Sequence, residues 1–115
     1  MPAAPEPKSD EWARDVSAGV AAGSRRALEA LYEATFDELL RYVRERTRRD
    51  DAFALDCVHD AWLRVVDGLP PLPTRAALDG WLRRAALSAA LDRLRRDQRR
   101  VARERSTLQP TTTGE

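Results

Sequence analysis

The sequence contains little of what sheet proteins and secreted proteins need. It has five Gly and 6% aromatic residues in a chain of 115, whereas Ala, Leu, Arg and Glu, which favour helices, are frequent. Its one cysteine, Cys57, has no partner for an internal disulfide, which favours a reducing compartment. The composition therefore predicts an all-α protein.

Membrane and export signals are also missing from the sequence. No apolar run approaches the roughly 18 residues that a membrane-spanning helix requires, and the N-terminal segment MPAAPEPKSD has no apolar core of a signal peptide. We therefore expect a cytoplasmic protein with no membrane partner.

Catalytic motifs are absent as well. The sequence has no Gly-rich phosphate loop and no serine nucleophile motif. His59 is the one histidine, and with Asp56 and Asp60 it could form only a weak metal-binding face, because metal ligands are usually more numerous. We expect a binding protein rather than an enzyme, with no cofactor and no metal site.

The net charge of +1 hides two segments of opposite sign. Residues 1–74 carry 10 Lys and Arg against 14 Asp and Glu, whereas residues 75–105 carry 10 Arg against 4 acidic residues. An acidic first part and a basic last part predict two kinds of surface, of which the second suits phosphate groups.

Helix signals predict one helical domain, residues 9–105, between disordered ends at 1–8 and 106–115. Capping residues predict helix starts at Ser9 or Asp10, at Ser24, at Asp50 or Asp51, and at Thr74. The proline-rich loop GLPPLPT separates the last two helices. We expect a three- to four-helix bundle with a long basic C-terminal helix.

Apolar residues at helical spacing identify the expected core. Trp62 and Trp81 fall at such positions in the last two helices, and both are predicted to be substantially buried. Beyond Leu94 the last helix has Val101 as its one large apolar residue before Arg105. Its C-terminal half is therefore expected to project from the bundle or to fray.

Two charged clusters have both a simple and a functional interpretation. Asp56 and Asp60 are four residues apart and share one side of the third helix, where Arg64 can pair with Asp60 and leave an ordinary solvated face. Four arginines fall within two turns of the last helix, where they can form an ordinary solvated helix end: Arg95, Arg96, Arg99 and Arg100. Alternatively, each cluster meets a partner of opposite charge.

Three consecutive segments resemble region two of the extracytoplasmic-function sigma factors. The segments ALDCVHDAWLRVV and GWLRRAALSAALDRLRR, with a proline-rich loop between them, are similar to its second part, and ALEALYEATFDELLRYVRERT is similar to its first helix. The resemblance covers about Ser24 to Arg100. It implies a protein that binds bacterial core RNA polymerase and promoter DNA in transcription initiation, with an anti-sigma factor as a further candidate partner.

The resemblance also implies roles for individual residues. The polymerase-binding side of the third helix corresponds here to Asp56, His59, Asp60, Leu63 and Arg64. The part that holds the non-template strand of the opened promoter corresponds to the loop Leu69–Thr74 and to Arg84, Ser88, Arg95, Arg96, Arg99 and Arg100. Basic side chains can neutralise phosphates there, and apolar walls can hold unstacked bases.

The sequence departs from the family pattern at several positions. Leu87 and Ser88 stand where an Arg-Asn pair is usual, and His59 stands where Gln is usual. The chain also ends soon after region two, so the family's helix-turn-helix domain is expected to be missing. An alternative interpretation is therefore a sigma mimic, or a module that binds polymerase or an anti-sigma factor, without opening promoters. A third is a basic helical nucleic-acid binder unrelated to polymerase.

Overall fold

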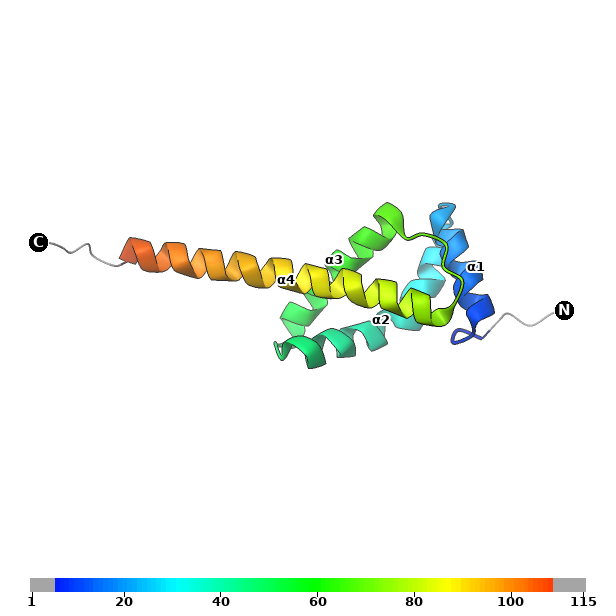
Figure 1. The fold of residues 1–115 in the computed structure, drawn as a ribbon, viewed down its shortest axis with the longest axis horizontal. Helices are drawn as coiled ribbons and strands as arrows, with labels where there is room; N and C mark the ends of the chain where they lie inside the picture. The colour runs from blue at the N-terminus through cyan, green and yellow to red at the C-terminus, as the bar shows by residue number, and fades with distance from the viewer. Residues whose placement is uncertain (1–5, 109–115) are drawn as a thin grey trace, which may run out of the picture.

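A computed structural model describes residues 6–108 as four helices (Figure 1). They are α1 (Asp10–Ala21), α2 (Arg25–Thr47), α3 (Asp51–Gly68) and α4 (Arg75–Leu108), and the described residues contain no strand. The prediction of an all-α bundle with a long basic C-terminal helix is confirmed. α4 continues three residues beyond the expected end at Arg105, so residues 106–108 belong to the helix. Residues 1–5 and 109–115, which make up most of the expected disordered ends, lie outside the described residues.

Local hydrogen bonds explain where the helices begin. Ser9, Ser24, Asp50 and Thr74 each accept a hydrogen bond from the backbone N–H three residues later, at 2.9 to 3.1 Å. Each bond satisfies one of the N–H groups that have no partner inside a helix at its first turn. The capping residues therefore set the boundaries that the sequence predicted.

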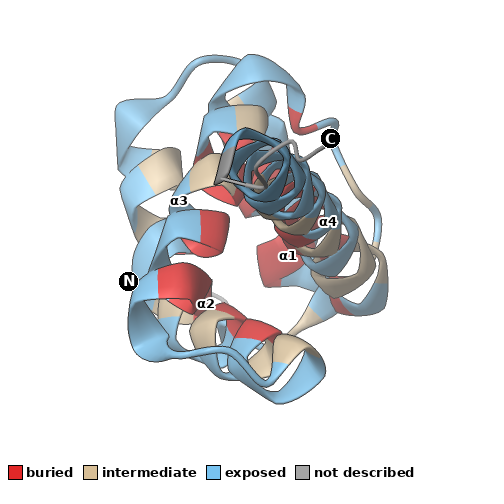
Figure 2. Ribbon diagram, turned by 90° about the vertical axis from the view of Figure 1, so that its left-hand side faces the viewer, coloured by how far each residue is buried: buried red, intermediate tan, exposed pale blue. Residues whose placement is uncertain are grey.

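The four helices enclose one hydrophobic core. Figure 2 shows the buried segments turned toward a common interior. Trp62 is 8% exposed, as predicted, whereas Trp81 is only partly buried and packs against the edge of the core. Leu55 and Val66, which also follow the apolar pattern of the third helix, are exposed because they lie on the side of α3 that faces away from the core.

Close packing joins α1 to the rest of the bundle. A Cβ atom added at Gly19 would lie 2.7 Å from the Cβ of Ala27 in α2, so a larger residue at this position would push the two helices apart. The buried Ser17 hydroxyl accepts a hydrogen bond from the backbone N–H of Leu72 at 2.8 Å. α1 thereby positions the loop between α3 and α4.

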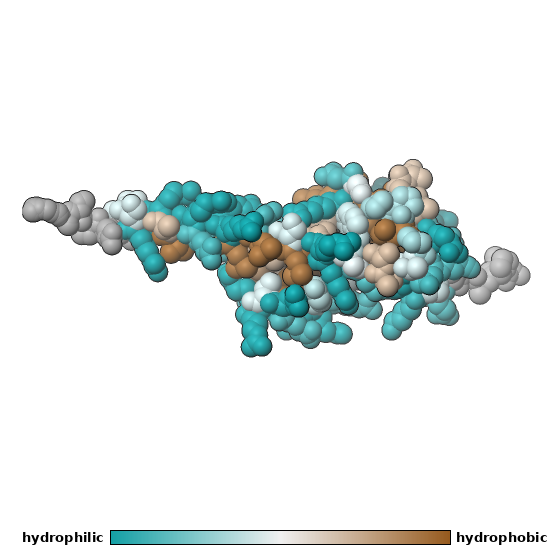
Figure 3. Space-filling view, in the orientation of Figure 1, coloured by the Kyte–Doolittle hydropathy of each residue, from teal (hydrophilic) through white to brown (hydrophobic). Residues whose placement is uncertain are grey.

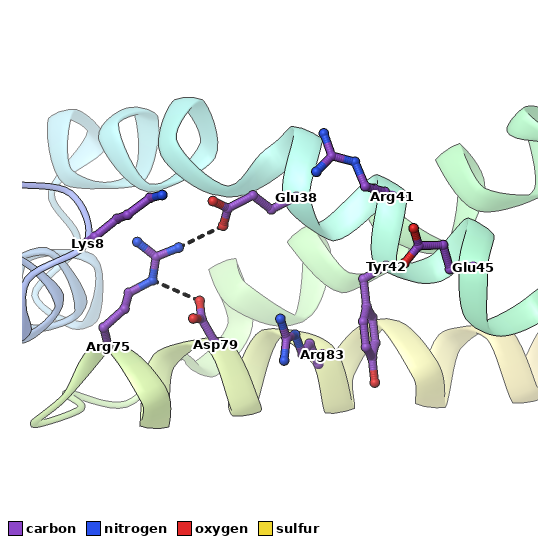
Figure 4. Close-up of a pocket in the computed structure, with 8 residues that line it drawn as sticks. All are labelled: Lys8, Glu38, Arg41, Tyr42, Glu45, Arg75, Asp79 and Arg83. Carbon is purple, nitrogen blue, oxygen red and sulfur yellow. Dashed lines mark hydrogen bonds and ion pairs between the residues drawn. The ribbon is translucent and has the colours of Figure 1, made fainter.

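Arg75 connects α4 to two other parts of the bundle (Figure 4). Its side chain is 11% exposed and forms ion pairs with Glu38 of α2 at 2.9 Å and with Asp79, one turn further along α4, at 2.8 Å. The guanidinium also donates to the backbone carbonyl of Pro7 and lies 5.4 Å from the centre of the Trp12 ring. A buried arginine is tolerated here because acceptors surround it.

The two halves of α4 differ in their surroundings. The first half crosses the bundle, with Leu78 and Leu82 buried and with four small residues in the contact: Ala85, Ala86, Ala89 and Ala90. The second half projects beyond the bundle, as predicted (Figure 1), and its residues from Arg99 to Thr107 are all exposed. Within residues 6–108, no helix has the length and apolar character needed to span a membrane.

Candidate functional site

The residues predicted to bind polymerase lie on the outer side of α3. His59 and Leu63 are exposed, and the exposed fractions of Leu63 and of the neighbouring Val66 are 65% and 63%. Asp56 is also exposed, whereas Asp60 and Arg64 are partly covered. We call Asp56, His59, Leu63 and Val66 the α3 surface. It combines exposed apolar side chains with acidic charge, which is an arrangement found at protein interfaces.

Arg93 of α4 balances the two carboxylates of α3. Its Nε donates to Oδ2 of Asp60 at 2.7 Å, and its Nη1 lies 3.6 Å from Oδ2 of Asp56. The hydrogen bond to Asp60 is the main cause that raises the pKa of the Arg93 guanidinium above its usual value. The acidic pair therefore has a partner within the bundle, and a net charge of −1 remains for the three groups.

Arg64 makes a different contact from the one expected. Its Nη1 donates to the backbone carbonyl of Ala85 at 3.2 Å, and its Nη2 pairs with Asp92 at 3.2 Å. Asp60 pairs with Arg93 instead, so the simple interpretation of an Arg64–Asp60 pair is wrong. Both contacts cross from α3 to α4, and they fix the α3 surface relative to the basic helix.

Neither Cys57 nor the acidic residues beside it form a metal centre. Cys57 is fully buried, and burial is the main cause that raises the pKa of its thiol, while the nearby Arg93 acts in the opposite direction. A search of residues 6–108 finds no group of three or more His, Cys, Asp or Glu side chains placed to hold a metal ion. The protonated thiol of Cys57 therefore contributes to the packing of the hydrophobic core.

The six residues of α4 that were predicted to bind DNA are all exposed, but they do not form one cluster. Arg84, Ser88, Arg95 and Arg99 are separated by four, seven and four residues, so they lie along one side of α4 over about 22 Å. We call these four residues the basic stripe. Figure 3 shows hydrophilic side chains covering much of the projecting half of α4, as expected for such a helix.

Arg96 and Arg100 lie on a neighbouring side of the helix and have local partners. Nε of Arg96 donates to the backbone carbonyl of Asp92 at 3.4 Å, and Nη2 of Arg100 lies 3.7 Å from Asp97. The four arginines that the sequence grouped are thus divided between two sides. Arg95 and Arg99 belong to the basic stripe, whereas Arg96 and Arg100 lie beside it.

The loop Leu69–Thr74 lies at the other end of the predicted DNA-binding region. Leu69 is 3% exposed and belongs to the core, and the backbone of Leu72 is held by Ser17. The three prolines of the loop are exposed. Of this predicted segment, the prolines are therefore the part that can meet a ligand.

Comparison with known families agrees with this arrangement of helices. The model of sigma-70 region 2 matches residues 31–100, which is more than half of the chain. The chain belongs to the sigma-70 region 2 family. The match to sigma-70 region 2 begins inside α2, includes all of α3, and ends in the projecting half of α4. Neither the search of curated proteins nor the search of solved structures finds a match.

Membership of the sigma-70 region 2 family narrows the class of function. The family is a domain of transcription factors and not a family of enzymes. Region 2 of sigma factors takes part in binding core RNA polymerase and in promoter melting. The matched segment contains both the α3 surface and the basic stripe.

Sequence reasoning missed Arg93, which joins the two predicted surfaces. The available signal was the repulsion between Asp56 and Asp60, because two carboxylates one turn apart call for a balancing charge. The sequence could not say which arginine supplies that charge, since the partner is 33 residues away from Asp60.

Proposed function

We propose that this chain is a sigma-factor-like protein that binds bacterial core RNA polymerase through the α3 surface and single-stranded promoter DNA along the basic stripe. The observation that carries the proposal is that the segment matched by sigma-70 region 2 places these two surfaces on adjoining helices. One surface is apolar and acidic, and the other is basic, so each suits a different partner.

The α3 surface supports the protein-binding half of the proposal. Leu63 and Val66 are large apolar side chains that remain exposed, and burying them against a partner removes apolar area from water. Asp56 lies beside them and is 58% exposed at its side chain, so it can add complementarity to a basic partner surface.

The basic stripe supports the nucleic-acid half of the proposal. Its three arginines have no ion-pair partner among residues 6–108, so their charges are available for phosphates. The stripe is about 22 Å long, which is enough to follow several nucleotides of a single strand. The exposed Leu91 lies within the same side of the helix and offers an apolar contact for a base.

A second candidate function is a polymerase-binding module that does not open promoters. Leu87 and Ser88, which stand where the family usually has an Arg-Asn pair, favour it because neither can supply that pair's charge and amide. The same α3 surface would then bind polymerase, or an anti-sigma factor, without a melted strand along α4. Footprinting of a promoter for unpaired bases separates the two functions.

Salt-dependent binding to a fluorescent single strand tests the nucleic-acid half. The triple variant Arg84→Gln, Arg95→Gln and Arg99→Gln should bind more weakly, with a log–log salt slope smaller by about 2, because each lost phosphate contact removes about 0.7. The control variant removes the same charge from exposed positions on α1 and α2: Arg14→Gln, Arg25→Gln and Arg26→Gln. Equal slopes for the two variants would remove the basic stripe from the proposed function.

A further inference from the structure

The loop Leu69–Thr74 has few backbone hydrogen bonds of its own. Its three prolines have no backbone N–H to donate. Among residues 6–108, no backbone hydrogen bond joins two residues of this loop, and the N–H of Leu69 donates back to the carbonyl of Val65 in α3 at 3.1 Å. The conformation of the loop therefore depends on contacts with other parts of the chain.

α1 supplies two acceptors that hold the loop. Figure 1 shows the loop passing beside α1 on its way from α3 to α4. The N–H of Leu72, within the loop, donates to Oγ of Ser17 at 2.8 Å. The N–H of Arg75, directly after the loop, donates to Oδ1 of Asp10 at 2.8 Å. Ser17 and Asp10 lie about two turns apart on α1, so the second half of the loop is fixed against one helix.

Burial makes the contact of Ser17 specific to the loop. Its side chain is 0% exposed, and a buried hydroxyl is destabilising unless it forms hydrogen bonds. Besides accepting from Leu72, its oxygen lies 3.3 Å from the carbonyl oxygens of Leu72 and Arg14, to which the hydroxyl can donate. An alanine at this position would leave the N–H of Leu72 without its partner.

The loop presents rigid side chains next to the basic helix. Its three prolines are exposed, whereas the side chain of Leu72 packs against the core. Because the proline ring fixes φ, these residues lose little freedom when a ligand covers them. Thr74 leads directly into α4, and Arg84, the first residue of the basic stripe, lies about 15 Å further along the helix axis.

We propose that Ser17 and Asp10 are positioning residues for single-stranded DNA. They hold the prolines of the loop where a base at one end of the strand bound along the basic stripe meets them, and neither residue touches the strand itself. The proposal rests on the nucleic-acid half of the function proposed above. The segment matched by sigma-70 region 2 begins at residue 31, so α1 lies outside it and the match assigns α1 no role.

The positioning role predicts a particular effect on DNA binding. Without either contact the loop has more conformations, and binding must then include the entropic cost of ordering it. The phosphate contacts of the basic stripe are unchanged, so the log–log salt slope should stay the same. A variant of the basic stripe, in contrast, should lower both the affinity and the slope.

Titration of a fluorescent single strand with the full chain tests this effect. Asp10→Ala and Ser17→Ala should each bind about three- to tenfold more weakly than the wild type, with the wild-type salt slope. Asp10→Asn should bind like the wild type, because its amide oxygen can accept the same N–H. Asp10 is exposed, so its variants should keep the fold, which circular dichroism checks.

Two matched controls separate the loop contacts from general effects on the helices. Glu11→Ala removes the neighbouring charge from the first turn of α1. Thr35→Val removes another buried hydroxyl, which donates to the carbonyl of Leu31 within α2 at 2.7 Å. Neither residue contacts the loop through a hydrogen bond, and both variants should bind the strand like the wild type.

Two further measurements locate the change in the loop. By NMR, the N–H of Leu72 should exchange with solvent faster in Ser17→Ala than in the wild type, while the N–H of the buried Val58 keeps its protection. Strands with one abasic position at a time should show a loss of affinity when the missing base is at one end of the bound segment. This loss should be smaller in Ser17→Ala, because the base meets a loop that is less ordered.

Several results would overturn the positioning role. Wild-type affinity in both alanine variants, with weaker binding by the triple variant of the basic stripe, would reject it and leave the proposed function standing. Failure of Asp10→Asn to restore binding, or an equal loss in Glu11→Ala, would mean that charge and not the hydrogen bond matters. A lowered salt slope in Ser17→Ala would mean that the bundle and not the loop has changed. No binding by the wild type would reject the nucleic-acid half of the proposed function together with this inference.

Discussion

Replacing Arg75 by Met tests whether the buried ion pairs hold α4 against the rest of the bundle. The change keeps a flexible apolar chain in the same space but removes the guanidinium. It thereby removes the ion pairs to Glu38 and Asp79, the bond to the Pro7 carbonyl, and the contact with the Trp12 ring. Because Met retains the packing of the aliphatic stem, the loss reports mainly on the charged group.

The expected magnitude follows from the exposure of each partner. The Glu38 and Asp79 side chains are 50% and 33% exposed, so they can regain water, and each pair should contribute no more than about 1 kcal/mol. The carbonyl that loses its donor and the contact with the aromatic ring add about 1 kcal/mol together. The free energy of unfolding should fall by about 2–3 kcal/mol, which lowers Tm by roughly 10–20 °C in a domain of this size.

Thermal and urea unfolding, both followed by circular dichroism, measure this loss. The matched control is Arg25→Met, because the Arg25 side chain is 91% exposed and its pair with Glu29, at 3.6 Å, lies on the surface. We expect the control to change stability by less than about 0.5 kcal/mol. If Arg75→Met is as stable as Arg25→Met, the ion pairs of Arg75 do not stabilise the bundle and the reasoning is refuted.

Three further predictions concern residues at the contact between α3 and the other helices. Arg93→Met should lower the free energy of unfolding by about 1 kcal/mol, because it leaves two carboxylates of α3 without their balancing charge. Salt screens this repulsion, so the loss measured by urea unfolding should be smaller at high salt. A loss that does not change with salt would contradict the electrostatic cause. Trp62→Ala should lower the free energy of unfolding by about 3–5 kcal/mol, because it leaves a cavity in the core. Trp62→Phe should lower it much less, because the ring is largely kept and the indole N–H has no hydrogen-bond partner among residues 6–108 to lose. Equal losses for the two variants in chemical denaturation would contradict this. The thiol of Cys57 should react with an alkylating reagent only after denaturation, because burial raises its pKa and keeps it protonated and covered; rapid labelling of the native protein by mass spectrometry would contradict this.

The fold could be predicted from the sequence because its signals are local. Ser9, Ser24, Asp50 and Thr74 cap the helices at the expected places, and a cap depends on residues only three positions away. The helical spacing of apolar residues likewise depends on one turn at a time. The end of α4 was placed too early because Ser and Thr are weak helix formers, yet residues 106–108 continue the helix.

The contacts between helices could not be predicted because they depend on packing in three dimensions. The partners of Arg64, Arg75 and Arg93 are 21 to 68 residues away in the sequence apart from Asp79. The same limit applies to exposure: Val66 follows the apolar spacing of α3 but lies on its outer side. The candidate residues were thus identified by type and helix, and their grouping required the structure.

The α3 surface is best tested with substitutions that leave Arg93 its partner. Asp60 holds Arg93 at 2.7 Å, so changing Asp60 would disturb the packing of α4 together with the surface. Asp56 is more exposed and lies farther from Arg93, at 3.6 Å, and Leu63 is 65% exposed. Asp56→Arg with Leu63→Arg therefore changes the charge and apolar character of the surface with little effect on the fold.

Titration of bacterial core RNA polymerase with the fluorescently labelled chain tests the central claim most directly. The wild type should bind, and the Asp56→Arg and Leu63→Arg variant should bind at least about tenfold more weakly, which corresponds to about 1.4 kcal/mol. The control Arg95→Gln with Arg99→Gln, on the basic stripe of α4, should bind core polymerase like the wild type in the absence of DNA. Undiminished binding by a folded Asp56→Arg and Leu63→Arg variant, or no binding by the wild type, would contradict the account.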